Sequence, residues 1–158
     1  MIEALRARVR AMLEAHSTAT LATAGAEGPW AAAVFYASDE PLNLYFVTDT
    51  GTRHGRDLQA GGPVAAAINS DVADWHEIRG LQLEGRASML SEAGRAAAME
   101  IYLAKFSGVR RLLDAPRDDS EKLIGERLDK VPLWRLAPSR IRLLDNRKRF
   151  GWKQELVL

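Results

Sequence analysis

The sequence contains no cysteine among its 158 residues. Disulfide bonds, thiolate catalysis and cysteine-ligated metal clusters are therefore excluded. The sequence also lacks an apolar run of about 18 residues, the length that a membrane-spanning helix needs, so we expect no membrane partner. The N-terminal segment carries charges throughout and has no apolar centre typical of a signal peptide, which predicts a cytoplasmic location.

Net charge is almost absent: 22 basic and 21 acidic residues leave a formal charge of +1. A nucleic-acid-binding domain usually shows a clearer basic excess, so we expect no nucleic-acid partner. Hydrophobic residues make up 47% of the chain, which is typical of a folded protein. At this length the composition predicts one domain over residues 1–158.

Histidine is scarce as well, and the three histidines His16, His54 and His76 stand far apart. No His-x-x-x-His spacing is present, and this spacing is the usual mark of a metal-binding helix. We therefore expect no metal site.

The pattern of apolar residues predicts a mainly β protein with peripheral helices. Residues 1–16 have apolar residues at helical spacing (Leu5, Val9, Met12, Leu13) and are predicted to form an amphipathic helix. Glycine and proline turns separate short runs rich in β-branched and aromatic residues, which are typical of antiparallel strands. Gly80 and Gly85 interrupt the longest run and indicate bends or bulges. The simplest closure is a six-stranded antiparallel barrel with about three helices at its ends.

The predicted elements follow one another without an obvious linker. The expected strands are 17–24, 30–37, 42–48, 64–69, 78–90 and 133–145, the last being either a pair or one strand bent at Pro138; the expected helices are 1–16, 52–60 and 91–106, with a polar connection over 107–121 and a helical turn over 122–129.

The segment Asp49–Gly55 is the sharpest local feature. A strand ends there, a glycine turn follows, and Thr52 is placed to cap the next helix. The first amides of a helix and its dipole favour an anion. Arg53 adds a forked donor and His54 another, so the segment is a candidate phosphate site. The alternative is an ordinary helix cap with solvated charges.

In succession, the strings STATLAT, WAAAVFYA, LYFVTDTGTRHGRDLQAGGPVAAAI and IRGLQLEGRA resemble the pyridoxamine 5′-phosphate oxidase-like superfamily. The resemblance covers roughly residues 15–90. It implies a split barrel of Greek-key type that binds FMN and works as a homodimer with the cofactor at the interface.

The resemblance also implies roles for individual residues. Arg53 and His54 would bind the FMN phosphate beside the cap residue Thr52, and Val47 and Thr48 would contact the flavin or the ribityl chain. The backbone of Ala32, Ala33, Val34 and Phe35 would lie along the flavin ring, where small side chains permit close approach. The alternative for the alanines is packing under a helix.

Several positions depart from the oxidase pattern. Gly80 stands where the oxidase has a glutamine that binds flavin, and Gln82, two residues further on the same face, is the expected substitute. Ala37 replaces a basic residue, and the substrate-gripping Arg-x-His element is missing from DNRKRFGWKQEL. These departures argue against synthesis of pyridoxal phosphate.

The C-terminal segment mixes basic residues with Phe150 and Trp152. Such a segment can form an aromatic wall over the partner's flavin, pack on the surface, or bind nucleic acid. We include Trp152 among the cofactor-binding candidates.

The predicted function is that of an FMN-dependent oxidoreductase acting on a small-molecule substrate or electron donor, with hydride transfer at the flavin N5. One alternative is a non-catalytic flavin-binding or sensing protein. Another is a split barrel that uses deazaflavin or haem instead of FMN. The identity of the substrate stays open.

Overall fold

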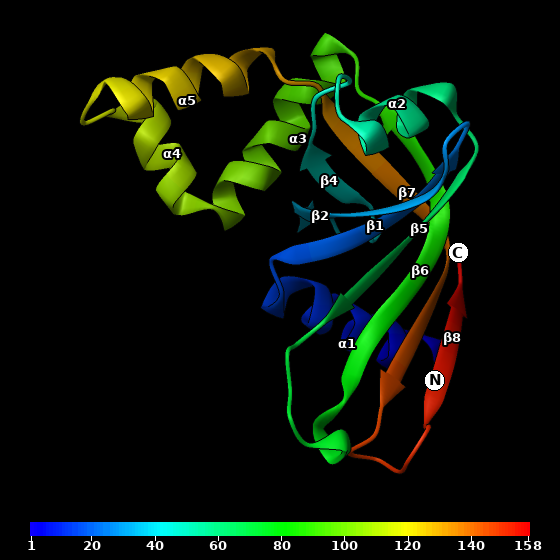
Figure 1. Ribbon diagram of the computed structural model, residues 1–158. Coiled ribbons are helices and arrows are strands. Elements are labelled where there is room, and N and C mark those ends of the chain that lie inside the picture. Colours follow the sequence, from blue (N-terminus) through cyan, green and yellow to red (C-terminus); the bar gives the residue numbers. More distant parts are fainter.

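The computed structural model describes all residues from 1 to 158 (Figure 1). Its strands are β1 (Thr18–Gly25), β2 (Gly28–Phe35), β3 (Ala37–Ser38), β4 (Leu44–Val47), β5 (Pro63–Asn69), β6 (Arg79–Met89), β7 (Leu133–Asp145) and β8 (Lys153–Val157). Its helices are α1 (Ile2–Ala15), α2 (Arg53–Ala60), α3 (Glu92–Lys105), α4 (Ser107–Asp114) and α5 (Asp119–Lys130), with one 3₁₀ turn at Trp75–Glu77.

All strands belong to one antiparallel sheet in the order β2-β1-β5-β6-β7-β4-β3, with β8 paired to β7. The sheet curls, and its end strands β2 and β3 are separated in the chain only by Tyr36. The Tyr36 side chain is fully buried, and its hydroxyl donates to the Leu13 carbonyl at 2.8 Å. The order β4-β7-β6-β5 is that of a Greek key.

The prediction of a β protein with peripheral helices is confirmed, but the predicted counts were wrong. The sheet has eight strands rather than six and stays open between its end strands β2 and β3 instead of closing into a barrel, and there are five α-helices rather than about three. The connection predicted over 107–121 contains α4, in which Val109, Leu112 and Leu113 stand at the helical spacing that the prediction missed. The C-terminal segment forms β8, in which only Leu156 is buried, so the alternation that marks a strand is weak.

A bulge bends the long β6–β7 ladder where Gly85 was predicted to mark one. The register shifts between Glu84 and Gly85, so that Gly85 faces Pro138. A Cβ on Gly85 would lie 2.1 Å from the Ala137 carbonyl oxygen, which leaves room only for glycine. Residues 133–145 are therefore one bent strand, the second of the two predicted forms.

Helix α1 packs into the curled sheet and completes the main core. The predicted stripe of Leu5, Val9, Met12 and Leu13 is buried, and these residues pack in the same cluster as the inward residues of the strands. No helix in the structure combines the length and the apolar character that crossing a membrane requires.

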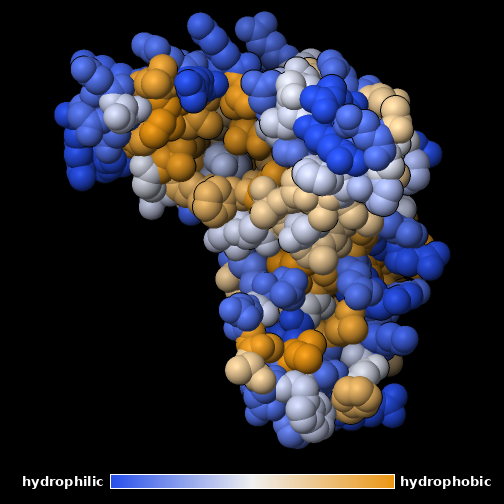
Figure 2. All heavy atoms as spheres, viewed as in Figure 1, coloured by the Kyte–Doolittle hydropathy of each residue, from blue (hydrophilic) through white to orange (hydrophobic).

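Helices α3, α4 and α5 form an arm that projects from one end of the curled sheet (Figure 1). No residue of α4 or α5 is buried, and the α5 side chains Leu123 and Ile124 are exposed. Figure 2 shows apolar side chains gathered over this arm and continuing toward the sheet. Phe106, between α3 and α4, packs against Phe35 of β2 with ring centroids 5.4 Å apart, which joins arm and sheet.

Candidate functional site

The end of β4 and the start of α2 meet at a hydrogen bond between two side chains. Thr48, the residue after β4, is buried, and its Oγ1 lies 2.6 Å from Nε2 of His54. Burial lowers the pKa of His54, while the nearby Asp57 carboxylate acts in the opposite direction. The imidazole is therefore mainly neutral at pH 7.

Thr52 caps α2, as predicted. Its Oγ1 accepts a hydrogen bond from the Gly55 amide at 3.0 Å and donates one to the Asp49 carbonyl at 2.7 Å. The backbone amides of Arg53 and His54 have no carbonyl partner, as is general for the first turn of a helix. Two free amides and the positive end of the helix dipole thus lie beside the side chains of Arg53 and His54.

The Arg53 guanidinium lies over the ring of Trp30, a residue that was not among the predicted site residues. Its guanidinium carbon is 4.2 Å from the centroid of the Trp30 ring, and Nη2 donates to the Glu27 carbonyl at 2.9 Å. The Nε atom is buried without a hydrogen-bond partner and lies 3.6 Å from a Glu27 carboxylate oxygen. The sequence signal that could have identified Trp30 is a tryptophan near the start of a strand made largely of alanine.

Strand β2 leads away from this cluster with alternate residues on its two faces. Ala32 and Val34 pair with the buried Leu21 and Ala19 and therefore face the core. Ala31, Ala33 and Phe35 are exposed on the outer face. The alternative that the alanines pack under a helix is wrong for the outer residues, because no element of the chain covers them.

The outer face continues across three further strands with small side chains. Register places Ala33 beside Thr20, Thr20 beside Ala67, and Ala67 beside Gln82. Gln82 therefore shares the exposed face with Ala33, three strands away, or roughly 14 Å at ordinary strand spacing. Within one chain it does not join the cluster around Arg53.

The two other predicted residues lie apart from each other. Val47 packs between the small clusters around Tyr102 and Tyr45, next to Thr48. Trp152 immediately precedes β8, which begins at the end of the curled sheet opposite α2 (Figure 1). Its ring is flanked by Arg8 and Lys148 and packs against the main core. The structure thus unites Thr48, Thr52, Arg53 and His54, with Val47 adjacent, and leaves Trp152 far from them.

The chain also matches a known protein family. A family model described as pyridoxamine 5′-phosphate oxidase matches residues 5–145. The chain belongs to this family. The predicted superfamily is therefore confirmed, and the match extends well beyond residues 15–90.

The chain is also similar to individual proteins and solved structures. The UPF0306 protein YhbP of Salmonella paratyphi B is 32% identical over 125 residues, which cover 78% of this chain and 74% of YhbP. The conserved hypothetical protein Rv2991 of Mycobacterium tuberculosis has a similar fold, with a TM-score of 0.70 and 23% identity over 90% of this chain and 85% of that one.

A heme binding protein from Mycobacterium smegmatis also has this fold. Its TM-score is 0.69 and its identity is 21%, with coverage of 96% of this chain and 56% of that one. The chain thus spans just over half the length of that protein. At this identity the likeness concerns the fold alone.

Proposed function

We propose that this protein is an FMN-binding oxidoreductase whose cofactor phosphate is held at the N-terminus of α2. The observation that carries the proposal is the Arg53 Nε, a buried donor without a hydrogen-bond partner, beside the free amides of Arg53 and His54. A buried unpaired donor is costly, and a phosphate oxygen is the acceptor that would satisfy it. The residues present therefore fit a phosphate group.

The four clustered residues would divide the work of holding the phosphate. Arg53 would donate from its guanidinium, and His54 from its imidazole or backbone amide. Thr52 keeps the first turn of α2 in place through its bond to Gly55. Thr48 orients the His54 ring through the 2.6 Å contact. The negative charge of Glu27 works against anion binding, because its carboxylate lies near Arg53 and Arg56.

Strand β2 would support the rest of the cofactor along its length. From Trp30, under Arg53, to Phe35, beside Phe106, the strand extends about 17 Å at the usual rise per residue. Alanine side chains along this path let a flat ring approach the backbone closely. A bound flavin would supply hydride transfer, and the protein would supply binding and orientation.

We further propose that the protein is a homodimer formed through this outer face. Thr20, Ala22, Ala31, Ala33 and Ala67 form a flat surface of small side chains that no part of the chain covers. Exposed Phe35 and the apolar arm continue the surface (Figure 2). A second copy seated on it would enclose the cofactor and bring its own Gln82 or Trp152 near the ring.

Haem binding is the second candidate function, supported by the fold that this chain shares with a heme binding protein. A haem iron needs an axial ligand such as histidine. His76 is exposed, and its Nδ1 lies 2.9 Å from an Asp74 carboxylate oxygen, while no partner contacts its Nε2. A carboxylate that orients an imidazole in this way is common for metal-bound histidines. A non-catalytic flavin-binding protein would differ from the proposed oxidoreductase only in showing no turnover.

Purification followed by ligand identification tests the proposal. The released ligand should have the mass and absorbance of FMN, and dialysed protein should bind added FMN saturably, with riboflavin binding more weakly because it lacks the phosphate. Bleaching of the bound flavin by NADH or NADPH, then reoxidation by an acceptor, would support an oxidoreductase over a sensor. A haem spectrum, or no saturable FMN binding by the dialysed protein, would overturn the proposal.

A further inference from the structure

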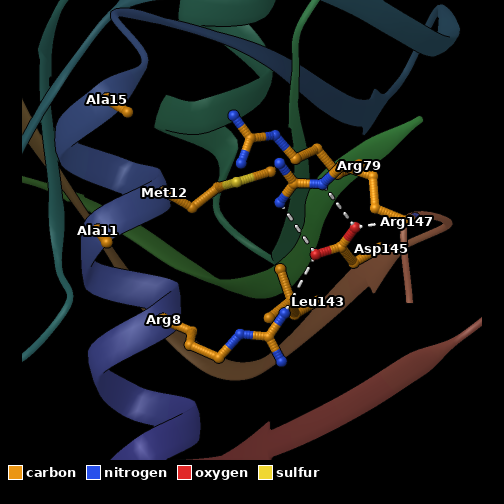
Figure 3. A pocket seen from close by; sticks show the side chains of 8 residues that line it. All are labelled: Arg8, Ala11, Met12, Ala15, Arg79, Leu143, Asp145 and Arg147. Atoms are coloured by element: carbon orange, nitrogen blue, oxygen red, sulfur yellow. Dashed lines mark hydrogen bonds and ion pairs between the residues drawn. The ribbon is translucent and has the colours of Figure 1, made fainter. Parts of the chain in front are cut away.

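A cavity lies at the end of the curled sheet opposite α2. It has a volume of about 320 Å³ and opens between helix α1 and the neighbouring ends of β6 and β7 (Figure 3). Pockets for small molecules begin at about this size. The cavity contains none of the residues of the proposed phosphate cluster.

Three arginines and one carboxylate line this cavity, which leaves two positive charges in excess. The carboxylate belongs to Asp145, which is buried. Its Oδ1 accepts from the backbone amide and Nε of Arg147, both at 3.1 Å. Its Oδ2 accepts from Arg8 Nη2 and Arg147 Nη2, both at 3.2 Å. Asp145 is thus saturated by two of the three arginines.

The third arginine, Arg79, has no acidic partner. Its strand position pairs directly with Asp145 in the β6–β7 ladder. Even so, its guanidinium forms no hydrogen bond or ion pair, and Figure 3 shows it inside the cavity. Asp145 has no free lone pair to offer, because Arg8 and Arg147 already occupy both oxygens. Arg79 is half-buried, but none of its guanidinium nitrogens is a buried unpaired donor, so they remain free to bind a ligand in the cavity.

The surroundings hold the charged groups in place and supply an apolar floor. Arg8 is fixed between Asp145 and the Trp152 ring, whose centroid lies 4.7 Å from the guanidinium carbon. The remaining lining residues are apolar: Ala11, Met12, Ala15 and Leu143. Glu77 is the one other acid that acts on Arg147, and it does not line the cavity.

We propose that this cavity is a second binding site, for a small molecule that carries one oxyanion group on a compact apolar body. The oxyanion, a phosphate or a carboxylate, accepts hydrogen bonds from Arg79 and from the outward nitrogens of Arg147 and Arg8. The apolar body lies against Met12 and Leu143. The site is independent of the FMN phosphate end and does not require the proposed function to be correct.

Binding of phenyl phosphate and of benzoate, measured by titration calorimetry at fixed ionic strength, tests the proposal and distinguishes the two headgroups. At least one probe should bind saturably, and Arg79→Gln should raise its dissociation constant about tenfold or more, as loss of a charge-assisted pair does. Arg79→Lys, which keeps the charge but not the fork, should recover part of the affinity.

Two control variants locate the site. Arg86→Gln removes an exposed arginine from the same strand and should leave binding unchanged. Arg53→Gln removes the proposed FMN phosphate donor and should also leave it unchanged. Binding that survives Arg79→Gln in a protein with the parental thermal midpoint, binding that disappears with Arg53→Gln, or no binding of either probe would each overturn the proposal.

Discussion

The guanidinium carbon of Arg53 lies 4.2 Å from the centroid of the Trp30 ring, so that a residue of α2 rests on the first part of β2. The stacking holds the arginine against a flat surface while its Nε remains without a hydrogen-bond partner. Arg53 is therefore placed before a ligand arrives, and a bound phosphate would not have to order a flexible side chain. The consequences can be measured at each partner.

Arg53→Gln should raise the FMN dissociation constant roughly fivefold to 150-fold, because a charge-assisted hydrogen bond contributes about 1–3 kcal/mol. Flavin fluorescence quenching on titration gives the affinity. Arg56→Gln is the matched control. Arg56 is exposed, lies three residues after Arg53 on α2, and pairs with the Glu27 carboxylate and the Gly51 carbonyl. Equal losses in the two variants would show a general charge effect and contradict the assignment.

Trp30→Leu should weaken FMN binding about two- to fivefold, since a cation–π contact at a partly exposed site contributes about 0.5–1 kcal/mol. Trp30→Phe keeps a ring and should lose less. The same fluorescence titration applies. If both variants bind FMN as tightly as the parent, Trp30 does not position Arg53.

The His54 imidazole should make the protein less stable in mild acid. Burial lowers its pKa below the ordinary value of 6.5. At pH values between the lowered pKa of the folded chain and 6.5, the unfolded chain holds the proton and the folded chain does not. The free energy of unfolding therefore falls as the pH drops through this window. Thermal midpoints measured across pH 5–8 should show a shallower decline in His54→Gln. An unchanged slope would mean that His54 titrates normally.

Lys105 should have the same sign of effect in the alkaline range. Its Nζ donates to the carbonyls of Leu13 and His16 and lies 4.1 Å from the Tyr36 ring centroid, and burial lowers its pKa to about 8. Between about 8 and the ordinary 10.5 the unfolded chain binds more protons, so stability from this group rises with pH. Urea midpoints measured at pH 7.5–10.5 should rise in the parent protein but not in Lys105→Met. An equal rise in the parent and the variant would contradict this prediction.

Ala33→Arg should convert the proposed dimer into a monomer and weaken FMN binding, because a long charged side chain would enter the face of small residues. Sedimentation velocity measures the oligomeric state. Ala7→Arg places the same side chain on an exposed position of α1 and should leave the dimer intact. A parent protein that binds FMN as a stable monomer would contradict the interface altogether.

Local sequence determined the elements whose signals are short-range. The stripe of Leu5, Val9, Met12 and Leu13 predicts α1 because a helix buries every third or fourth residue. Thr52 predicts the start of α2 because its hydroxyl can reach the amide three residues on. Gly85 predicts a bulge because only glycine tolerates such close approach of another backbone. The family resemblance was legible in this succession as well.

Only the tertiary structure decided which distant residues meet. Trp30 lies under Arg53 because the β1–β2 hairpin returns the chain to α2, and no local pattern encodes that distance. Trp152 lies beside Arg8 instead of the phosphate cluster because β8 pairs with the far half of β7. Arg79 is left without an acid because Arg8 and Arg147, from two other elements, already saturate Asp145. Charge, capping and periodicity are local properties, whereas partnership between side chains depends on how the sheet curls.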